Sequence, residues 1–400
     1  MHGDGTKLGT TTNNPPPARL LDLTRLIRRA GRVLTGVDRV ELAYLRAFLD
    51  QPEPLFALIR SRYGYILLNR DGMAKLAPWL AEPDTGNPPD QQNRRALRLA
   101  RRVALGRVPP PLLARMLRRH LPQGTAYVNV GHSNLSHRVL RTAQGALKAQ
   151  ITVLIHDVIP LEHPEMQRAG TVPAFAAMIE RVGQMADLII YNSADTQARA
   201  ARYVGTRANS IVAYLGTEVA TPLPDTLPTG LPPARPYFVC IGTIEPRKNH
   251  AFLLDVWDDM GAHAPTLVIA GSRGWKNEDV FARLDRLPPD APVQEVSGLS
   301  DGALAALVQR SAGVLFPTHA EGFGLPATEA AAAGVPLIVN ELAVFREILG
   351  KIPIYASVSD RYLWKNKIKE LAEAEPDTRR PQHHQLPTWD AHFKTVLRLT

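Results

Sequence analysis

Residues 321–329 read Glu-Gly-Phe-Gly-Leu-Pro-Ala-Thr-Glu and follow the short apolar run of residues 313–316. Gly322 and Gly324 leave their backbone N–H groups accessible to a ligand, because glycine carries no Cβ atom. Pro326 suits the first turn of a helix, where its missing N–H costs no hydrogen bond. The start of a helix presents partial positive charge and free amides to an anion. The stretch therefore predicts a strand, a loop and a helix with a phosphate site between them.

Two carboxylates bracket this loop, Glu321 before the expected helix and Glu329 inside it. Carboxylates in these positions can accept hydrogen bonds from hydroxyl groups of a ribose and of a sugar. Two glutamates at this spacing are usually plain surface residues. The glycines, the proline and the strand–loop–helix context favour the binding role here.

A second loop of the same kind lies at residues 242–249, after the apolar run of residues 237–241. It carries Arg247 and Lys248 side by side, between an expected strand and an expected helix. Adjacent cations there can neutralise a diphosphate leaving group without a metal ion. A solvated surface pair is the alternative. Because both loops follow strands of one expected sheet, and ligands bind at that edge of a parallel sheet, we expect them to form one anion site.

Short apolar strands alternate with helical stretches along the chain, which predicts an α/β fold with parallel sheets covered by helices on both faces. In the second half, strands are expected at residues 237–241, 266–270, 293–296, 313–316 and 336–339, and helices at 251–259, 278–287, 301–311 and 326–333. In the first half, residues 151–155 and 188–191 are the clearest strands, and residues 36–48 form the first long helix.

Six prolines between residues 221 and 236 interrupt any regular element, which indicates a linker between two domains. We expect five segments: a disordered N-terminus (1–17), an N-terminal Rossmann-like domain (18–220), the linker (221–236), a C-terminal Rossmann-like domain (237–380) and a terminal segment that crosses back to the N-terminal domain (381–400).

The two loops, in this order, resemble glycosyltransferase family 4, whose members have the GT-B fold of two Rossmann-like domains facing across a cleft. The resemblance is strong over residues 237–349, where the intervening Ala270-Gly271-Ser272-Arg273-Gly274-Trp275 also matches in place. It implies that the C-terminal domain binds a nucleotide-sugar donor and that the N-terminal domain binds the acceptor.

The resemblance also assigns roles to individual residues. Glu329 would bind the nucleotide ribose, Glu321 would face the transferred sugar, and Arg247 and Lys248 would hold the diphosphate. The remaining donor-binding positions that it implies are Gly36, Gly242, Thr243, Gly271, Gly298, Leu299, Gly322, Phe323, Gly324 and Leu325. Residues 297–301 correspond to the region beside the base.

The N-terminal half carries weaker matches. His156 opens a string, His-Asp-Val-Ile-Pro-Leu-Glu-His-Pro, that looks like the family's histidine loop, which reaches across the cleft to the donor sugar. A lone histidine after a strand is usually structural, but the whole string favours a catalytic His156. Residues 36–39 resemble the glycine-containing loop near the phosphates, and residues 192–196 match a helix-capping turn.

The family resemblance implies a retaining hexosyltransferase that acts in polysaccharide biosynthesis without a covalent intermediate, a cofactor or a metal ion. The histidine loop and the Glu-Gly-Phe-Gly-Leu-Pro string look like those of bacterial polysaccharide mannosyltransferases, so GDP-mannose is the first expectation for the donor. UDP-linked and deoxysugar donors stay open, and the acceptor would be a glycan or a lipid-linked sugar. The alternatives are a non-catalytic GT-B module that binds a nucleotide sugar or glycan, and a GT-B phosphorylase or epimerase.

The formal net charge of +9 is concentrated in one region. Residues 91–156 contain no Asp or Glu, and their first half holds Arg94, Arg95, Arg98, Arg101, Arg102, Arg107, Arg115, Arg118 and Arg119. An arginine-lined helix can lie on an anionic membrane surface, although a solvated helix face is the plainer explanation. Nucleic acid is not expected as a partner, because residues 91–121 lack aromatic side chains on which bases could stack.

The sequence shows neither a secretory signal nor a membrane-spanning run. The polar start of the chain has no apolar core of a secretory signal, and no run reaches the roughly 18 to 20 apolar residues that span a bilayer. The single cysteine, Cys240, lies in an apolar run and is expected to be buried in a strand. We therefore expect a cytoplasmic protein that contacts the inner face of the membrane peripherally.

Overall fold

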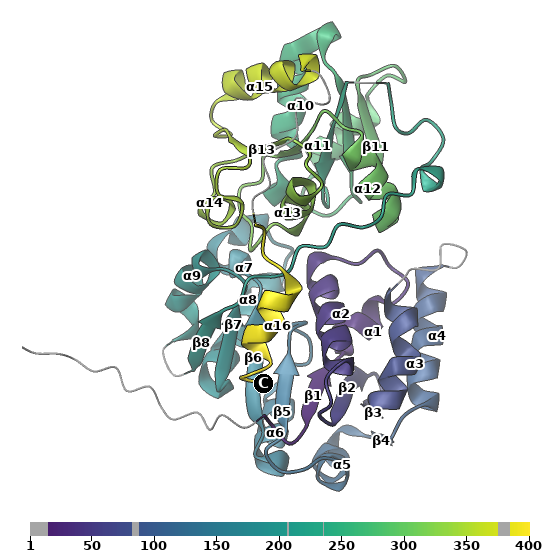
Figure 1. Ribbon diagram of the computed structural model, residues 1–400, viewed down its shortest axis with the longest axis vertical. Helices are drawn as coiled ribbons and strands as arrows, with labels where there is room; N and C mark the ends of the chain where they lie inside the picture. Colours follow the sequence, from purple (N-terminus) through teal and green to yellow (C-terminus); the bar gives the residue numbers. More distant parts are fainter. Residues whose placement is uncertain (1–14, 82–87, 206–207, 235, 375–384) are drawn as a thin grey trace, which may run out of the picture.

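The computed structural model describes residues 15–81, 88–205, 208–234, 236–374 and 385–400. Two α/β halves, each built on one β-sheet, are stacked along the long axis of the molecule (Figure 1). The N-terminal half has an eight-stranded sheet and the C-terminal half a six-stranded sheet. This arrangement confirms the α/β fold with two sheets that the sequence predicts.

The N-terminal sheet has the strand order β4-β3-β2-β1-β5-β6-β7-β8. Its strands are β1 (Arg19–Asp22), β2 (Leu55–Ser61), β3 (Gly64–Asn69), β4 (Gly106–Val108), β5 (Ala126–Asn129), β6 (Gln150–Ile155), β7 (Leu188–Tyr191) and β8 (Asn209–Val212). Its helices are α1 (Thr24–Arg29), α2 (Gly36–Leu49), α3 (Arg70–Ala81), α4 (Pro89–Arg102), α5 (Leu113–His120), α6 (His137–Leu147), α7 (Ile159–Glu162), α8 (Thr171–Met185) and α9 (Ala194–Val204).

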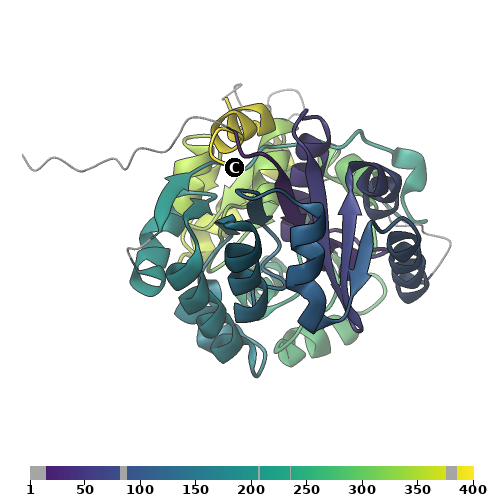
Figure 2. The same ribbon diagram turned by 90° about the horizontal axis from the view of Figure 1, so that it is seen from below.

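Both faces of this sheet are buried. Consecutive strand residues point to opposite faces, and so Leu20 and Leu21 of β1 belong to two different apolar clusters. Both side chains are fully buried. The view from below shows helices on both sides of the sheet (Figure 2). The uninterrupted apolar strands of the sequence are therefore explained by a sheet without a solvent face.

The N-terminal sheet is not purely parallel, which corrects the expectation from the sequence. β3 pairs antiparallel with both β2 and β4, whereas the other pairings are parallel. β2 ends at Ser61 and β3 begins at Gly64, so only two residues connect them. A connection this short can join only antiparallel neighbours, because parallel strands need a crossover of a dozen or more residues.

The C-terminal sheet is parallel throughout, with the order β11-β10-β9-β12-β13-β14. Its strands are β9 (Tyr237–Ile241), β10 (Thr266–Ala270), β11 (Val293–Val296), β12 (Gly313–Phe316), β13 (Leu337–Val339) and β14 (Ile354–Tyr355). Its helices are α10 (His250–Met260), α11 (Glu278–Asp285), α12 (Asp301–Gln309), α13 (Leu325–Ala332), α14 (Ala343–Leu349) and α15 (Arg361–Glu373). β9 and β12 are neighbours, so the loops that follow them emerge side by side.

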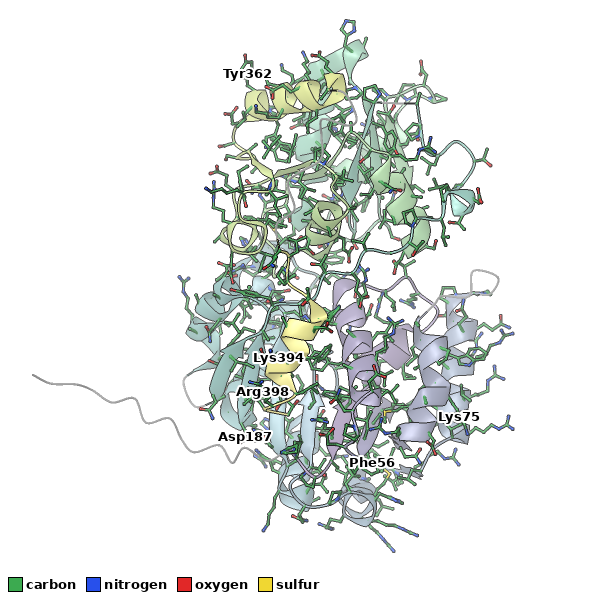
Figure 3. The ribbon with its side chains drawn as sticks, viewed as in Figure 1. Phe56, Lys75, Asp187, Tyr362, Lys394 and Arg398 are labelled. Carbon is green, nitrogen blue, oxygen red and sulfur yellow. The ribbon has the colours of Figure 1, made fainter. Side chains whose placement is uncertain are left out.

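The chain passes between the halves twice. The first crossing follows β8 and leads into β9, and the second lies between α15 and α16 (Trp389–Val396). α16 packs on the N-terminal half, where its His392 contacts the hydroxyl of Tyr44 at 2.9 Å. Figure 3 shows Lys394 and Arg398 at this end of the chain beside the N-terminal sheet. The last element of the sequence therefore belongs to the same body as the first.

The arginine-rich helices bury their apolar sides within the protein. In α4, Ala96 and Ala100 are buried while Arg94, Arg98 and Arg102 face solvent. The sequence suggests Leu112, Leu113, Met116 and Leu117 as a second apolar surface, but the last three are buried in the N-terminal core and only Leu112 is exposed. Among the described residues, no helix is long and apolar enough to cross a bilayer.

Candidate active site

The two loops predicted to form one anion site do meet. Lys248 Nζ and Arg247 Nη1 both bind the carboxylate of Glu321, the second at 3.1 Å from Oε2. These residues are far apart in the sequence and meet because β9 and β12 are adjacent strands. All three side chains are mostly buried, which strengthens their electrostatic interaction relative to a surface pair.

Close backbone packing shapes the β9 loop. Gly242 has a φ of +138°, a conformation that favours glycine. A Cβ atom at Gly271, after β10, would lie 1.9 Å from the carbonyl oxygen of Gly242, so no larger residue fits there. A Cβ at Gly274 would similarly meet the side chain of Thr243 at 2.7 Å. Gly242, Thr243 and Gly271 are thus packing positions that hold the Arg-Lys loop at the sheet edge.

Arg247 is bound on several sides. Its guanidinium donates to Glu245 Oε1 at 2.7 Å and to the carbonyl of Ala320 at 2.8 Å, in addition to Glu321. Burial disfavours the charged form, but Glu321, Glu245 and Asp157 together raise the pKa of Arg247 above its usual value. Asp157, next to His156, therefore brings a third carboxylate to the cations from the other half of the molecule.

The cations also control the charge of Glu321. Burial alone would raise the pKa of this carboxyl, but Lys248 and Arg247 lower it overall. Glu321 is therefore ionised across the neutral range and occupies the cations while no ligand is bound. A diphosphate entering this site would compete with Glu321 for Arg247 and Lys248.

Glu329 has a different environment on α13. Its Oε1 forms an ion pair with Nη1 of Arg39 at 2.6 Å, and Arg39 lies in the first turn of α2 in the N-terminal half. Burial raises the pKa of Glu329 to about 7, although Arg39 opposes that shift. The carboxylate lines a largely apolar cavity of about 170 Å³ together with Asp301 and Leu304 of α12. The cavity lies beside residues 297–301, the segment that the family resemblance places next to the base.

The start of α13 offers backbone groups between the two glutamates. Gly324 has a φ of +92° and precedes Leu325, the first helical residue. The side chains of Phe323 and Leu325 are buried in the core, so only their backbone can face a ligand. A Cβ at Gly36 would lie 3.6 Å from Leu325 Cδ1, which places the predicted glycine loop of the N-terminal half against this helix start.

Two of the remaining predicted positions lie at the edge of this arrangement. Gly298 has a φ of +76° with open space around it, and Leu299 packs partly against the core. Both follow β11, on the side of the sheet that leads to the cavity beside Glu329. The carboxylate of Glu321 pairs with Lys248 and Arg247, and not with either of these two residues. Their predicted role beside the base therefore rests on the position of this loop.

The His156 ring is turned toward its own half. Its Nε2 contacts the carbonyl of Val130 at 2.6 Å, and its ring lies 5.0 Å from that of His132. Burial and the neighbouring His132 hold the pKa of His156 well below its usual value, so the ring is neutral near pH 7. The backbone of His156 faces the other half, because a Cβ at Gly322 would lie 2.2 Å from its carbonyl oxygen.

Several site residues were not predicted from the sequence. Arg39 belongs to the predicted glycine loop and Asp157 to the predicted histidine loop, but the sequence assigns neither residue a role. His132 lies in a loop after β5 and carries no motif that would have singled it out. Its φ of +55° is a conformation that non-glycine residues rarely adopt. Burial lowers the pKa of His132 to about 4.

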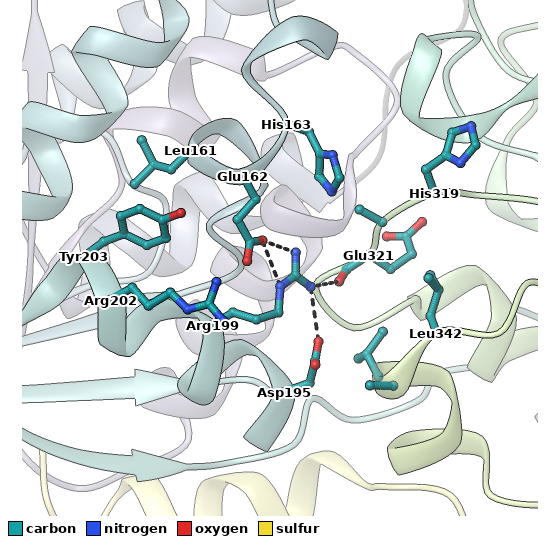
Figure 4. Close-up of a pocket in the computed structure, with 13 residues that line it drawn as sticks. Leu161, Glu162, His163, Asp195, Arg199, Arg202, Tyr203, His319, Glu321 and Leu342 are labelled. Atoms are coloured by element: carbon teal, nitrogen blue, oxygen red, sulfur yellow. Dashed lines mark hydrogen bonds and ion pairs between the residues drawn. The ribbon is translucent and has the colours of Figure 1, made fainter.

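A second cavity of about 410 Å³ opens between the halves on the Glu321 side of the loop (Figure 4). It is lined by polar side chains from both halves, including His163, Arg199 and Arg202 from one and His319 and Glu321 from the other. The two glutamates of the loop thus face two different cavities. Among the described residues, no group of His, Cys, Asp and Glu side chains forms a metal-binding cluster.

Comparison with known proteins gives matches to part of the chain. Residues 228–380 match the family model described as glycosyl transferases group 1. The serotype-specific mannosyltransferase WbdA of Escherichia coli is 28% identical over 49% of this chain and 26% of its own length. The O-antigen chain mannosyltransferase RfbU of Salmonella typhimurium is 30% identical over 34% of this chain and 38% of its own length. The matches thus span well under half of these relatives.

Solved structures match over the whole chain. HepE of Anabaena, crystallised with UDP and glucose, superposes with a TM-score of 0.62 at 15% identity, covering 96% of this chain and 94% of that one. Sucrose-phosphate synthase of Thermosynechococcus elongatus gives a TM-score of 0.63 at 17% identity and covers 96% and 98%. At these identities the likeness concerns the fold. The chain thus has the GT-B fold, and its residues 228–380 are similar to the glycosyl transferases group 1.

Proposed function

We propose that this protein is a retaining glycosyltransferase that moves a sugar from a nucleotide-diphosphate sugar to a glycan or a lipid-linked acceptor in polysaccharide biosynthesis. The observation that carries the proposal is the buried cluster in which Arg247 and Lys248 share the carboxylate of Glu321 beside the start of α13. Two cations and a helix start are suited to a diphosphate, and a carboxylate between them and a polar cavity is suited to a sugar.

In the proposed reaction, the donor lies along the loop between the two cavities. The nucleoside occupies the cavity beside Glu329, and the diphosphate replaces Glu321 on Arg247 and Lys248. The bond between the anomeric carbon and the diphosphate breaks, while an acceptor hydroxyl from the cavity beside Glu321 forms the new bond on the same face of the sugar. The acceptor proton passes to the leaving phosphate oxygen, and the cations stabilise the charge that develops there.

GDP-mannose is the proposed donor, because the curated relatives are mannosyltransferases. Residues 297–301 and the apolar cavity beside Glu329 would contact the base. A thermal-shift screen with GDP-, UDP- and dTDP-linked sugars tests the choice, since a ligand at one hundred times its Kd stabilises the folded state by about 2.7 kcal/mol. If only UDP-sugars stabilised the protein, the donor would be a UDP-sugar and not GDP-mannose.

Transfer to a soluble acceptor, followed by NMR of the anomeric proton of the product, tests activity and retention together. We expect the α-configured donor to give an α-linked product, and we expect EDTA to leave the rate unchanged because Arg247 and Lys248 supply the positive charge. An inverted product, or a rate lost in EDTA and restored by Mn²⁺, would refute the corresponding part. Donor binding without transfer or hydrolysis would indicate a non-catalytic module.

We further propose that the N-terminal half contacts an anionic membrane surface through α4, α5 and the β2–β3 turn. Tyr63 of this turn is 71% exposed, and Arg101 of α4 lies beside it, with its guanidinium carbon 5.7 Å from the ring centre. Each basic residue at an anionic surface contributes about 1 kcal/mol. Cytoplasmic placement on the inner face of the membrane belongs to this proposal.

Sedimentation with anionic vesicles tests the membrane contact. Replacing Arg94, Arg98, Arg115 and Arg118 with Gln should abolish binding at low salt. Replacing four exposed cations of the C-terminal half, Arg286, Arg310, Lys351 and Lys369, removes the same charge and should leave binding intact. Equal loss in both variants would show an effect of net charge alone.

A further inference from the structure

The first two turns of α9 hold the backbone of the glutamate loop across the boundary between the halves. Ser193 Oγ and Thr196 Oγ1 both donate to the carbonyl oxygen of Gly322, at 3.2 and 3.1 Å. Arg199 Nη1 donates to the carbonyl oxygen of Glu321 at 3.1 Å (Figure 4). Positions three apart on a helix lie on one face, so the three side chains form a single row.

The C-terminal half also holds the start of α9 through a helix outside the loop. Glu347 of α14, in the C-terminal half, accepts from the backbone N–H groups of Ala194 and Asp195 at 2.6 and 2.9 Å. The first N–H groups of a helix have no partner within the helix, and Glu347 satisfies two of them from the other half. A carboxylate at a helix start is also favoured by the helix dipole. Each half therefore supplies one charged side chain to the contact: Arg199 from the N-terminal half and Glu347 from the C-terminal half.

The loop has little freedom in this contact. The carbonyl of Gly322 receives two hydroxyl donors, one for each of its lone pairs, and both hydroxyls are fully buried. Gly322 itself lies against the carbonyl of His156, where a Cβ atom would not fit. Arg199 is oriented by Glu162 and by Asp195, the latter at 3.1 Å. The conformation of residues 321–324 thus depends on side chains of the N-terminal half.

We propose that Thr196, with Ser193 and Arg199, is a positioning residue that sets the glutamate loop in its reactive conformation when the halves come together. This rests on the proposed glycosyl transfer. Among the hydrogen bonds and ion pairs of the described residues, α9 binds neither Arg247 and Lys248 nor Glu329. It acts through the carbonyl oxygens of Glu321 and Gly322. Its engagement aligns the Glu321 carboxylate and the start of α13 for transfer, whereas the nucleoside site beside Glu329 forms without it.

Thr196→Val tests the proposal, because valine keeps the shape of threonine and removes the hydroxyl. We expect kcat to fall about tenfold with GDP affinity unchanged within twofold, and Thr196→Ser to restore kcat. Gln197→Ala, on the same helix, removes a bond to Ser210 within the N-terminal half and should leave kcat unchanged. Equal kcat in wild type and Thr196→Val, or no rescue by Ser, would overturn the role of Thr196.

Hydrogen exchange of the amides in residues 321–325 provides a readout that does not need activity. We expect faster exchange in Thr196→Val and in Glu347→Gln than in wild type, with wild-type exchange in the control Glu341→Gln, whose carboxylate pairs with Arg346 of the same half. Unchanged exchange in both test variants would overturn the contact itself. If the wild type transfers no sugar, the proposed function fails, and altered exchange alone would still support the α9–loop contact.

Discussion

Glu321 and Glu329 sit eight positions apart on one loop and helix, yet their surroundings shift their pKa values in opposite directions. Two cations outweigh burial at Glu321 and lower its pKa, whereas burial outweighs Arg39 at Glu329 and raises its pKa to about 7. Glu321 is thus the counter-ion of the proposed diphosphate site while no ligand is bound. Glu329 is a carboxylate that titrates near neutrality beside an apolar cavity, where hydroxyl groups are suitable partners. One motif therefore supplies two different chemical environments.

Removing Arg247 should have the largest effect, because it removes one of the two cations that bind Glu321 and that would hold the leaving diphosphate. We expect Arg247→Ala to reduce kcat by roughly 100-fold or more, as is typical when one preorganised donor to developing charge is lost. Arg273→Ala is the control, since that side chain pairs with Glu295 and Asp285 at the surface. Steady-state kinetics with the identified donor measures both, and near-wild-type turnover of Arg247→Ala would remove this residue from the mechanism.

Glu321→Gln separates the sugar from the nucleotide. The neutral side chain no longer competes for Arg247 and Lys248, so GDP affinity should stay the same or increase. Sugar transfer should fall about tenfold or more, since a positioned charged hydrogen bond is typically worth about 1.5 to 3 kcal/mol. Isothermal titration with GDP and initial rates on one preparation provide the two numbers. Weaker GDP binding in this variant would contradict the division of roles.

Glu329→Gln should show the opposite pattern. A ribose that donates its hydroxyl protons to this carboxylate loses charge-assisted bonds, so affinity for GDP and for the donor should fall together by about tenfold. The kcat at saturating donor should change little. Arg39→Gln provides a comparison, because it frees the Glu329 carboxylate without changing it. If both glutamate variants weakened GDP equally, the two carboxylates would not have separate functions.

The smallest expected effect is on the pH dependence of stability. Glu329 has a higher pKa in the folded protein than its ordinary value of 4.5, so the folded state binds the proton more tightly. Its contribution to the free energy of unfolding therefore falls as pH rises from about 4.5 to about 7, and then levels off. Between pH 5 and pH 8 the wild type should lose more stability than Glu329→Gln, by about 1 to 3 kcal/mol. Parallel urea melts at both pH values measure this difference.

The parallel sheet could be predicted closely, because its strands are continuous apolar runs between turn residues. β9, β10, β11 and β12 cover the predicted residues, while β13 begins at Leu337, one residue later than expected. Pro336 precedes it and has no N–H to donate to the ladder. In the N-terminal half, the turn between β2 and β3 contains Arg62 and Tyr63, which are not typical turn residues, and the antiparallel pair was missed for that reason.

The site was predictable where its motifs lie on loops at the same edge of one sheet. The meeting of Arg247, Lys248 and Glu321 follows from that common edge, because β9 and β12 are parallel neighbours. The sequence predicts a helix-capping turn at residues 192–196. Ser193 does cap α9, because its Oγ accepts from the N–H of Thr196 at 3.0 Å. Its second bond is donated to the carbonyl oxygen of Gly322, which lies 129 positions later in the sequence and in the other half of the molecule. No local pattern reveals such a contact, because it depends on how the two halves face each other.

The double passage of the chain between the halves has a mechanical consequence. One passage enters β9 and the other returns to α16, which is attached to the N-terminal half by the contact of His392 with Tyr44. Two connections between two bodies restrict their relative motion more than a single connection does. If the halves separate and close again, this restriction favours the return of α9 to the same part of the glutamate loop.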